Sequence, residues 1–135
     1  MAAGWEIGYG PGPGEFWTDR QGRFMDIGES KEDAVFVLEP RGRLDSANAR
    51  SFEERVLAAL EQGESALLID FASLDYISSA GLRVLLMGAK RLQQSGGTIA
   101  LCALSSSIHE VFEISGFLTI FTVHSDRAAA LAAMG

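Results

Sequence analysis

The sequence predicts an α/β fold, with one mixed, mostly parallel sheet of about five strands packed against about four helices. Two observations carry this prediction. Short β-branched or apolar runs alternate with longer segments whose apolar residues recur at helical spacing. Strands that alternate with helices imply crossover connections, and crossovers favour parallel pairing. The chain has 135 residues, which is the size of one ordinary domain.

The first regular elements are predicted as an antiparallel pair of strands. Residues 24–29 form the first strand, residues 30–33 form a polar turn, and the β-branched run at residues 34–39 forms the second strand. Pro40 follows this run. Because proline cannot donate a backbone hydrogen bond to a neighbouring strand, the second strand ends there, bulges there or lies at a sheet edge.

A turn at residues 42–45 (GRLD) leads into the first predicted helix. Asp45 or Ser46 can cap this helix, because a short side-chain oxygen accepts a free backbone N–H. Gly63 closes the helix. The apolar residues that recur at helical spacing within it are Phe52, Val56, Leu57 and Leu60.

Residues 66–71 (ALLIDF) are nearly all apolar, which is typical of a strand at the centre of a sheet. Residues 72–81 are predicted as a loop rich in small side chains. A second helix follows and ends at the pair Gly96–Gly97. Its apolar stripe comprises Leu82, Leu85, Leu86, Ala89 and Leu92.

The remaining elements continue the alternation. Residues 98–103 form a strand, Ser105 caps a third helix, and Gly116 stops that helix. Residues 118–123 form the last strand, and Ser125 caps a final Ala-rich helix. The predicted order is β-β-α-β-α-β-α-β-α, with no internal repeat.

Residues 1–24 differ from the rest of the chain, because glycines alternate there with Pro11 and Pro13 and both tryptophans are present. Glycine and proline argue against a regular element. Two interpretations are open. The segment is a flexible appendage, including an extension before an alternative start at Met25, or an arm that docks its aromatic residues on the domain or on a second copy. We therefore divide the chain into an N-terminal arm, residues 1–24, and a domain, residues 25–135.

Composition narrows the classes of function. Hydrophobic residues make up 47% and charged residues 21%, which excludes wholesale disorder. The net charge of −7 disfavours direct binding to nucleic acid or an anionic membrane, because both surfaces are negative. No apolar stretch approaches the roughly 20 residues of a spanning helix, and the start of the chain lacks the pattern of a secretion signal. We expect no insertion into a membrane.

The single cysteine, Cys102, cannot form an internal disulfide, which favours a cytoplasmic protein. It lies in an apolar run and is predicted to be a buried small side chain. Cys102, His109 and His124 together are too few ligands for a typical structural zinc site. We expect no metal and no cofactor.

The segment Asp75-Tyr76-Ile77-Ser78-Ser79-Ala80-Gly81-Leu82 carries the most information about function. It follows a buried strand and opens a helix, where the first N–H groups lack partners and the helix dipole is positive. A covalent phosphate is tolerated at such a place. Small residues after Ser79 also leave the surface open to another protein. The alternative is that Ser78 or Ser79 is only a helix cap.

The stretch at residues 74–86 (LDYISSAGLRVLL) resembles the signature of STAS domains, specifically the anti-sigma factor antagonists. The GRLD turn at residues 42–45, the pair Gly96–Gly97 and residues 101–116 also match in kind and spacing. The resemblance covers roughly residues 25–135. Several separated motifs in the right order make it specific.

The resemblance implies a function. Such antagonists bind an anti-sigma factor, a serine kinase of the histidine-kinase-like ATPase type that otherwise holds a sigma factor inactive. Binding releases the sigma factor. The kinase turns the antagonist off by phosphorylating one serine at this helix N-terminus, and a phosphatase resets it. We expect a monomer or weak dimer.

Aligned on Gly81–Leu82, the phosphorylated position of the family falls on Ser79. Ser78 stands where the family commonly has aspartate, so Ser78 is the alternative site. Asp45 matches the family's aspartate at the end of the GRLD turn, which lies near the phosphorylated loop. The predicted partner-binding residues are Asp45, Asp75, Ser78, Ala80, Gly81 and Arg83. Lys90 and Arg91, further along the same helix, extend its charged face.

Two other classes of function are alternatives. A hydrolase that uses Ser79 needs a base and an orienting acid, and no G-x-S-x-G elbow is present, so an enzyme is not expected. A STAS interaction module of another system is the serious rival. Such a module would be a nucleotide-sensing domain, a stressosome scaffold or a lipid-transport accessory subunit.

Overall fold

The computed structural model describes residues 25–135, and the predictions for residues 1–24 lie outside the described residues. Its main sheet has five strands in the order β1-β2-β4-β6-β7. β1 is antiparallel to β2, and the other neighbours are parallel, as predicted. The strands are β1 (Ile27–Glu32), β2 (Val35–Pro40), β4 (Ala66–Asp70), β6 (Thr98–Cys102) and β7 (Thr122–His124).

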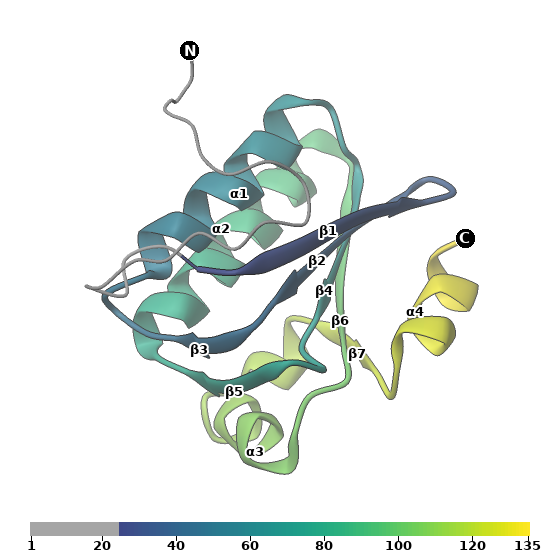
Figure 1. Cartoon of the computed structure of the whole chain (residues 1–135). Coiled ribbons are helices and arrows are strands. Elements are labelled where there is room, and N and C mark those ends of the chain that lie inside the picture. The colour runs from purple at the N-terminus through teal and green to yellow at the C-terminus, as the bar shows by residue number, and fades with distance from the viewer. Residues whose placement is uncertain (1–24) are drawn as a thin grey trace.

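Helices cover both faces of this sheet (Figure 1). Two long helices, α1 and α2, lie side by side on one face, while the short α4 lies on the opposite face. α3 packs near one end of the sheet, close to β5. The described helices are α1 (Ala49–Glu61), α2 (Ser79–Ser95), α3 (Ser106–Ile114) and α4 (Arg127–Met134), which matches the predicted number.

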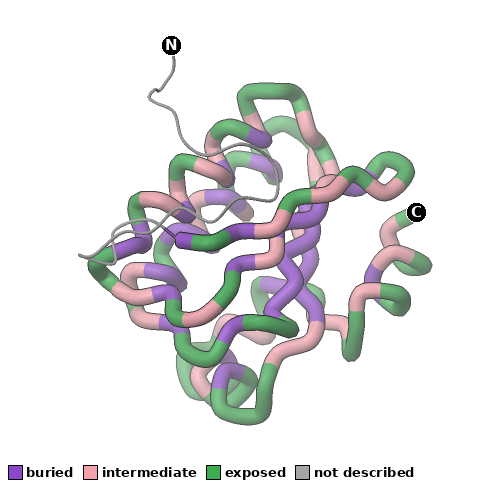
Figure 2. Tube along the Cα trace, viewed as in Figure 1, coloured by how far each residue is buried: buried purple, intermediate pink, exposed green. Residues whose placement is uncertain are grey.

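β4 lies at the centre of the sheet, which explains its continuous apolar sequence. Leu67 and Ile69 point into the larger core under α1 and α2, whereas Leu68 points into a smaller core under α4. Successive side chains of a strand point to opposite faces, so a strand covered on both sides must be apolar throughout. Figure 2 shows buried residues concentrated along these central strands. Cys102 is fully buried in the smaller core, as predicted.

The first hairpin turns later than predicted. Residues 30–33 were expected to form the turn, but β1 runs through most of this segment and the turn comprises Asp33 and Ala34. Asp33 adopts a positive φ of 55° there. The polar residues that suggested a turn belong to an edge strand, and Lys31 forms an ion pair with Glu64. Of the three outcomes left open at Pro40, the structure shows the first, because β2 ends there and lies inside the sheet.

Two short strands were missed by the sequence analysis. β3 (Gly42–Leu44) was predicted as a turn, and β5 (Leu74–Ile77) was predicted as part of a loop. They pair with each other in parallel and form a separate two-stranded sheet, which we call the ribbon. Strands of three and four residues are too short to show a period, and each depends on a partner about 30 residues away.

The start of α1 also differs from the prediction. Neither Asp45 nor Ser46 caps the helix, because Asn48 occupies that position. The Asp45 carboxylate instead accepts the backbone N–H of Ala47 at 3.0 Å and that of Asn48 at 3.2 Å, which closes a turn before the helix. Gly63, with a φ of 90°, follows the helix end as predicted.

The predicted strand at residues 118–123 is mostly absent. A 3₁₀ turn, η1 (Phe117–Thr119), occupies its first half, and only β7 remains of the strand. The N–H of Phe121 bonds to the carbonyl of Phe117 at 3.0 Å, and both rings pack edge-on against Phe112. Aromatic packing thus holds this segment in a turn despite its β-branched sequence.

The ends of α3 and α4 show one correct and one incorrect prediction. Ser105 caps α3 by accepting the N–H of Ile108 at 3.3 Å. Ser125 was predicted to cap α4, but the cap is its neighbour Asp126, which accepts the N–H of Ala129 at 2.8 Å. Both residue types are good caps, so sequence alone does not separate adjacent candidates.

Arg127, the first residue of α4, joins this helix to three strands. Its guanidinium lies 2.8 Å from Asp70, 3.0 Å from Glu39 and 3.3 Å from Glu32. The Asp70 side chain is only 6% exposed, so without Arg127 it would be a buried carboxylate with no cation beside it. The pKa of the Cys102 thiol is raised to about 12. Burial is the largest cause, and the nearby Asp70 carboxylate is the next largest.

Candidate functional site

The two adjacent serines at the start of α2 have different environments. Ser78 is the cap, because its hydroxyl accepts the N–H of Gly81 at 3.3 Å. Its own N–H donates to the carbonyl of Leu44 at 2.8 Å, which attaches the start of α2 to the ribbon. Ser79 is the first residue of the helix and is exposed. Within residues 25–135 its hydroxyl makes no hydrogen bond, so it is open to an outside group.

Gly81 explains why the small residues of this segment are needed. A Cβ placed there would lie 2.7 Å from the Leu44 side chain and 2.9 Å from that of Ile77. All three residues are buried. The glycine therefore allows the first turn of α2 to lie directly on the ribbon.

The ribbon carries the other predicted residues to this end of α2. Asp45 follows β3 directly and is half-buried, with its carboxylate engaged in the turn before α1. Asp75 is exposed on β5. On the same ribbon the guanidinium of Arg43 stacks over the exposed ring of Tyr76, 4.2 Å from its centre. Both members of this stacked pair lay within segments that the sequence analysis singled out, but their contact was not predicted.

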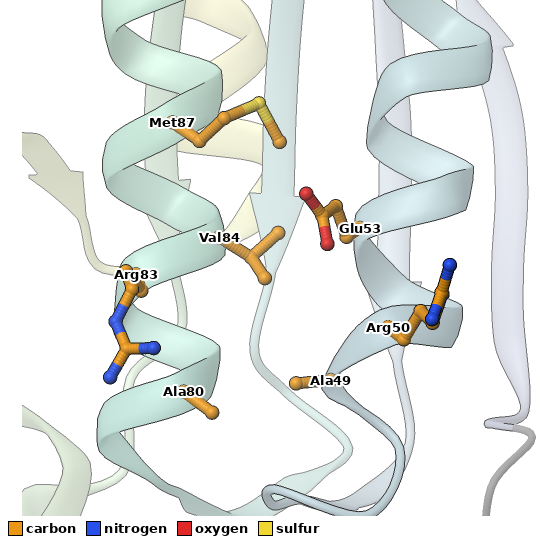
Figure 3. Close-up of a pocket in the computed structure, with 7 residues that line it drawn as sticks. All are labelled: Ala49, Arg50, Glu53, Ala80, Arg83, Val84 and Met87. Carbon is orange, nitrogen blue, oxygen red and sulfur yellow. The ribbon is translucent and has the colours of Figure 1, made fainter.

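A groove of about 420 Å³ opens between α1 and α2, beside the first turn of α2 that carries Ala80 (Figure 3). It contains two predicted residues, Ala80 and Arg83, but its opposite wall comes from α1 and was not predicted. No local motif indicates that wall, because it meets α2 only through helix packing. The residues that line the groove are Ala49, Arg50, Glu53, Ala80, Arg83, Val84 and Met87.

The histidines do not contribute to this site. His109 is exposed on α3, and His124 is half-buried on β7. Within the described part of the chain, no three His, Cys, Asp or Glu side chains are placed to share a metal ion. Among residues 25–135 no helix is both long and apolar enough to span a bilayer.

A comparison with family models matches the STAS domain over residues 29–130. The chain belongs to the STAS domain family. A curated relative is BtrV of Bordetella bronchiseptica, which carries the name of an anti-sigma factor antagonist. It is 46% identical over 109 residues, which is 81% of this chain and 94% of the relative.

Solved structures share the fold. One is a protein of Thermotoga maritima described as an anti-sigma factor antagonist, with a TM-score of 0.77 and 22% identity, covering 80% of this chain and 93% of that one. Another is the Bacillus cell fate determinant SpoIIAA in its phosphorylated form. Its TM-score is 0.67 at 20% identity, with 82% of this chain and all of that chain covered. These matches confirm the predicted architecture.

Proposed function

We propose that this chain is an anti-sigma factor antagonist that binds an anti-sigma factor through the start of α2 and is switched off by phosphorylation of Ser79. The relative BtrV, at 46% identity over most of both chains, supports the class of function. The observation that carries the switch is the difference between the two serines. Ser78 is engaged as a cap, whereas the hydroxyl of Ser79 is exposed and free of hydrogen bonds among the described residues.

The physical basis of the switch is local. A phosphate adds about −1.5 to −2 charges and three acceptor oxygens. The free N–H groups of the first turn of α2 accommodate these charges within the chain. In an interface, the same group must lose its water and meets any carboxylate of the partner with repulsion. A loss of about 2.8 kcal/mol weakens binding a hundredfold, so no refolding is needed.

The proposed cycle has three proteins. The anti-sigma factor is a serine kinase of the histidine-kinase-like ATPase type, which phosphorylates Ser79 and releases the modified chain. A phosphatase restores the hydroxyl. The chain itself acts as a binding protein in the cytoplasm, without a catalytic role.

A pull-down from native lysate, with and without ATP, tests this proposal. We expect an anti-sigma factor to be retained without ATP and released with it, and intact-mass analysis to show one added phosphate. Ser79→Ala should remain unmodified and bound, and Ser79→Asp should bind at least about tenfold more weakly. Retention of a membrane transporter in place of a kinase would assign the chain to another STAS system.

Ser78→Asn is the matched control. Asparagine keeps the side-chain acceptor that caps α2 but has no hydroxyl to phosphorylate. We expect this variant to be phosphorylated as the wild type is. Phosphorylation of Ser79→Ala together with loss of phosphorylation in Ser78→Asn would move the switch to Ser78.

A further inference from the structure

We propose, resting on the function above, that the groove between α1 and α2 receives an acidic segment of the anti-sigma factor and that Arg83 is its ion-pair partner. Phosphate on Ser79 would then compete with this segment for the same guanidinium. The phosphorylated chain would lose the partner both by repulsion and by occupation of Arg83.

The shape of the groove suits an inserted side chain. Its base is apolar, formed by the buried Ala49 and Val84 with the half-buried Ala80 and Met87. Two alanines facing each other across the helices leave the space open, because no long side chain fills it. A volume of about 420 Å³ accommodates several side-chain groups of a partner segment.

The charges of the groove select the kind of partner. Arg50 and Arg83 line the groove from opposite helices, together with Glu53, on a chain whose net charge is −7. Arg50 already lies 3.8 Å from Glu54 on its own helix. Arg83 is exposed and forms no ion pair within residues 25–135. A carboxylate is the group that complements this guanidinium.

Arg83 is also placed to reach a phosphate on Ser79. Residues four apart on a helix are neighbours, with Cβ atoms about 5–6 Å apart. Side chains on a helix point back toward its N-terminus. Figure 3 shows the guanidinium of Arg83 extending in this direction, toward the end of α2 that carries Ala80. Arg83 therefore lines the groove, and its guanidinium points along α2 toward the end that carries the modified serine.

Titration calorimetry tests the groove, with the purified recombinant anti-sigma factor that is retained in the pull-down. We expect Arg83→Ala to weaken binding by roughly fivefold to tenfold, with a shallower dependence on salt. Arg91→Ala is the control, because Arg91 is exposed on the same helix but outside the groove, and it should stay within about twofold. Glu53→Gln should strengthen binding, since it removes a carboxylate that repels an acidic partner.

A second measurement needs no partner. With phosphoserine incorporated at position 79, a ³¹P NMR titration should give a lower phosphate pKa in the otherwise wild-type chain than in Arg83→Ala, because the guanidinium favours the dianion. Equal pKa values in the two chains would overturn the competition for Arg83.

The two proposals fail in different ways. If the wild-type chain binds its anti-sigma factor but Arg83→Ala and Arg91→Ala bind equally well, the groove assignment is wrong and the proposed function stands. Weaker binding of Glu53→Gln would likewise show that the partner segment is not acidic. If the wild-type chain binds no anti-sigma factor at all, both proposals are wrong.

Discussion

Replacing Arg127 should destabilise the fold more than replacing any exposed arginine. Its guanidinium contacts Asp70, Glu39 and Glu32, at 2.8, 3.0 and 3.3 Å. Arg127→Ala leaves Asp70 without its cation at a site where that side chain is only 6% exposed. Breaking a buried pair by removing one partner costs about 3–5 kcal/mol.

The expected loss is smaller than this, because the Arg127 side chain is 32% exposed and solvent screens its charge. The Asp70 carboxylate also keeps the N–H of Ala72, 2.9 Å away. We therefore expect Arg127→Ala to lower the free energy of unfolding by about 2 kcal/mol. For a domain of this size, that corresponds to a fall in Tm of roughly 6–10 °C.

Urea unfolding followed by circular dichroism measures this loss at equilibrium. Asp70→Asn in the Arg127→Ala background should recover at least about 1 kcal/mol, because the amide keeps its bond to the backbone and carries no buried charge. Arg55→Ala is the surface control. Its pair with Glu29 has side chains 39% and 36% exposed, and its loss should cost less than about 1 kcal/mol. Equal losses in the Arg127 and Arg55 variants, or no recovery by Asp70→Asn, would refute the reasoning.

Three further predictions follow from the same structure. Because the pKa of Cys102 is raised to about 12, the unfolded chain loses this proton first, so stability should fall between about pH 9 and pH 12. Cys102→Ala should flatten that fall in parallel urea series, and an unchanged slope would contradict the assignment. Gly81→Ala should cost about 1–3 kcal/mol in urea unfolding, because a Cβ there meets Leu44 at 2.7 Å, and a neutral result would show that the contact relaxes freely. Ser78→Ala should cost about 1 kcal/mol through loss of the cap, while Ser79→Ala should leave Tm nearly unchanged. An equal cost at the two serines would remove the distinction on which the phosphorylation proposal depends.

Patterns within single segments predicted much of the main sheet. The continuous apolar run at residues 66–71 identified β4 as a central strand, because both of its faces are covered. Helical spacing of apolar residues located the packed faces of α1 and α2. The cap and small-residue signals around Ser79 correctly indicated an exposed hydroxyl at a helix start.

Features that depend on segments distant in the sequence escaped prediction. The ribbon exists because Arg43 and Leu44 pair with the backbone of β5. The sequence of neither short segment predicts this pairing. Arg50 and Glu53 appear in the sequence only as polar positions of an amphipathic helix. They become part of a groove because α1 packs beside α2. Phe117 illustrates the opposite error, since a β-branched run near it suggested a strand that ring packing converts to a turn.

The ribbon positions α2 through main-chain hydrogen bonds, which do not depend on which side chains the ribbon exposes. Two of these bonds lie at the ends of the ribbon. The N–H of Gly42 donates to the carbonyl of Ser73 at 2.9 Å, and the N–H of Ser78 donates to the carbonyl of Leu44 at 2.8 Å. Outward-pointing side chains near these hydrogen bonds can therefore be replaced without changing how α2 is held. Domains built on this scaffold can thus differ widely in their outward side chains while their backbones fold alike.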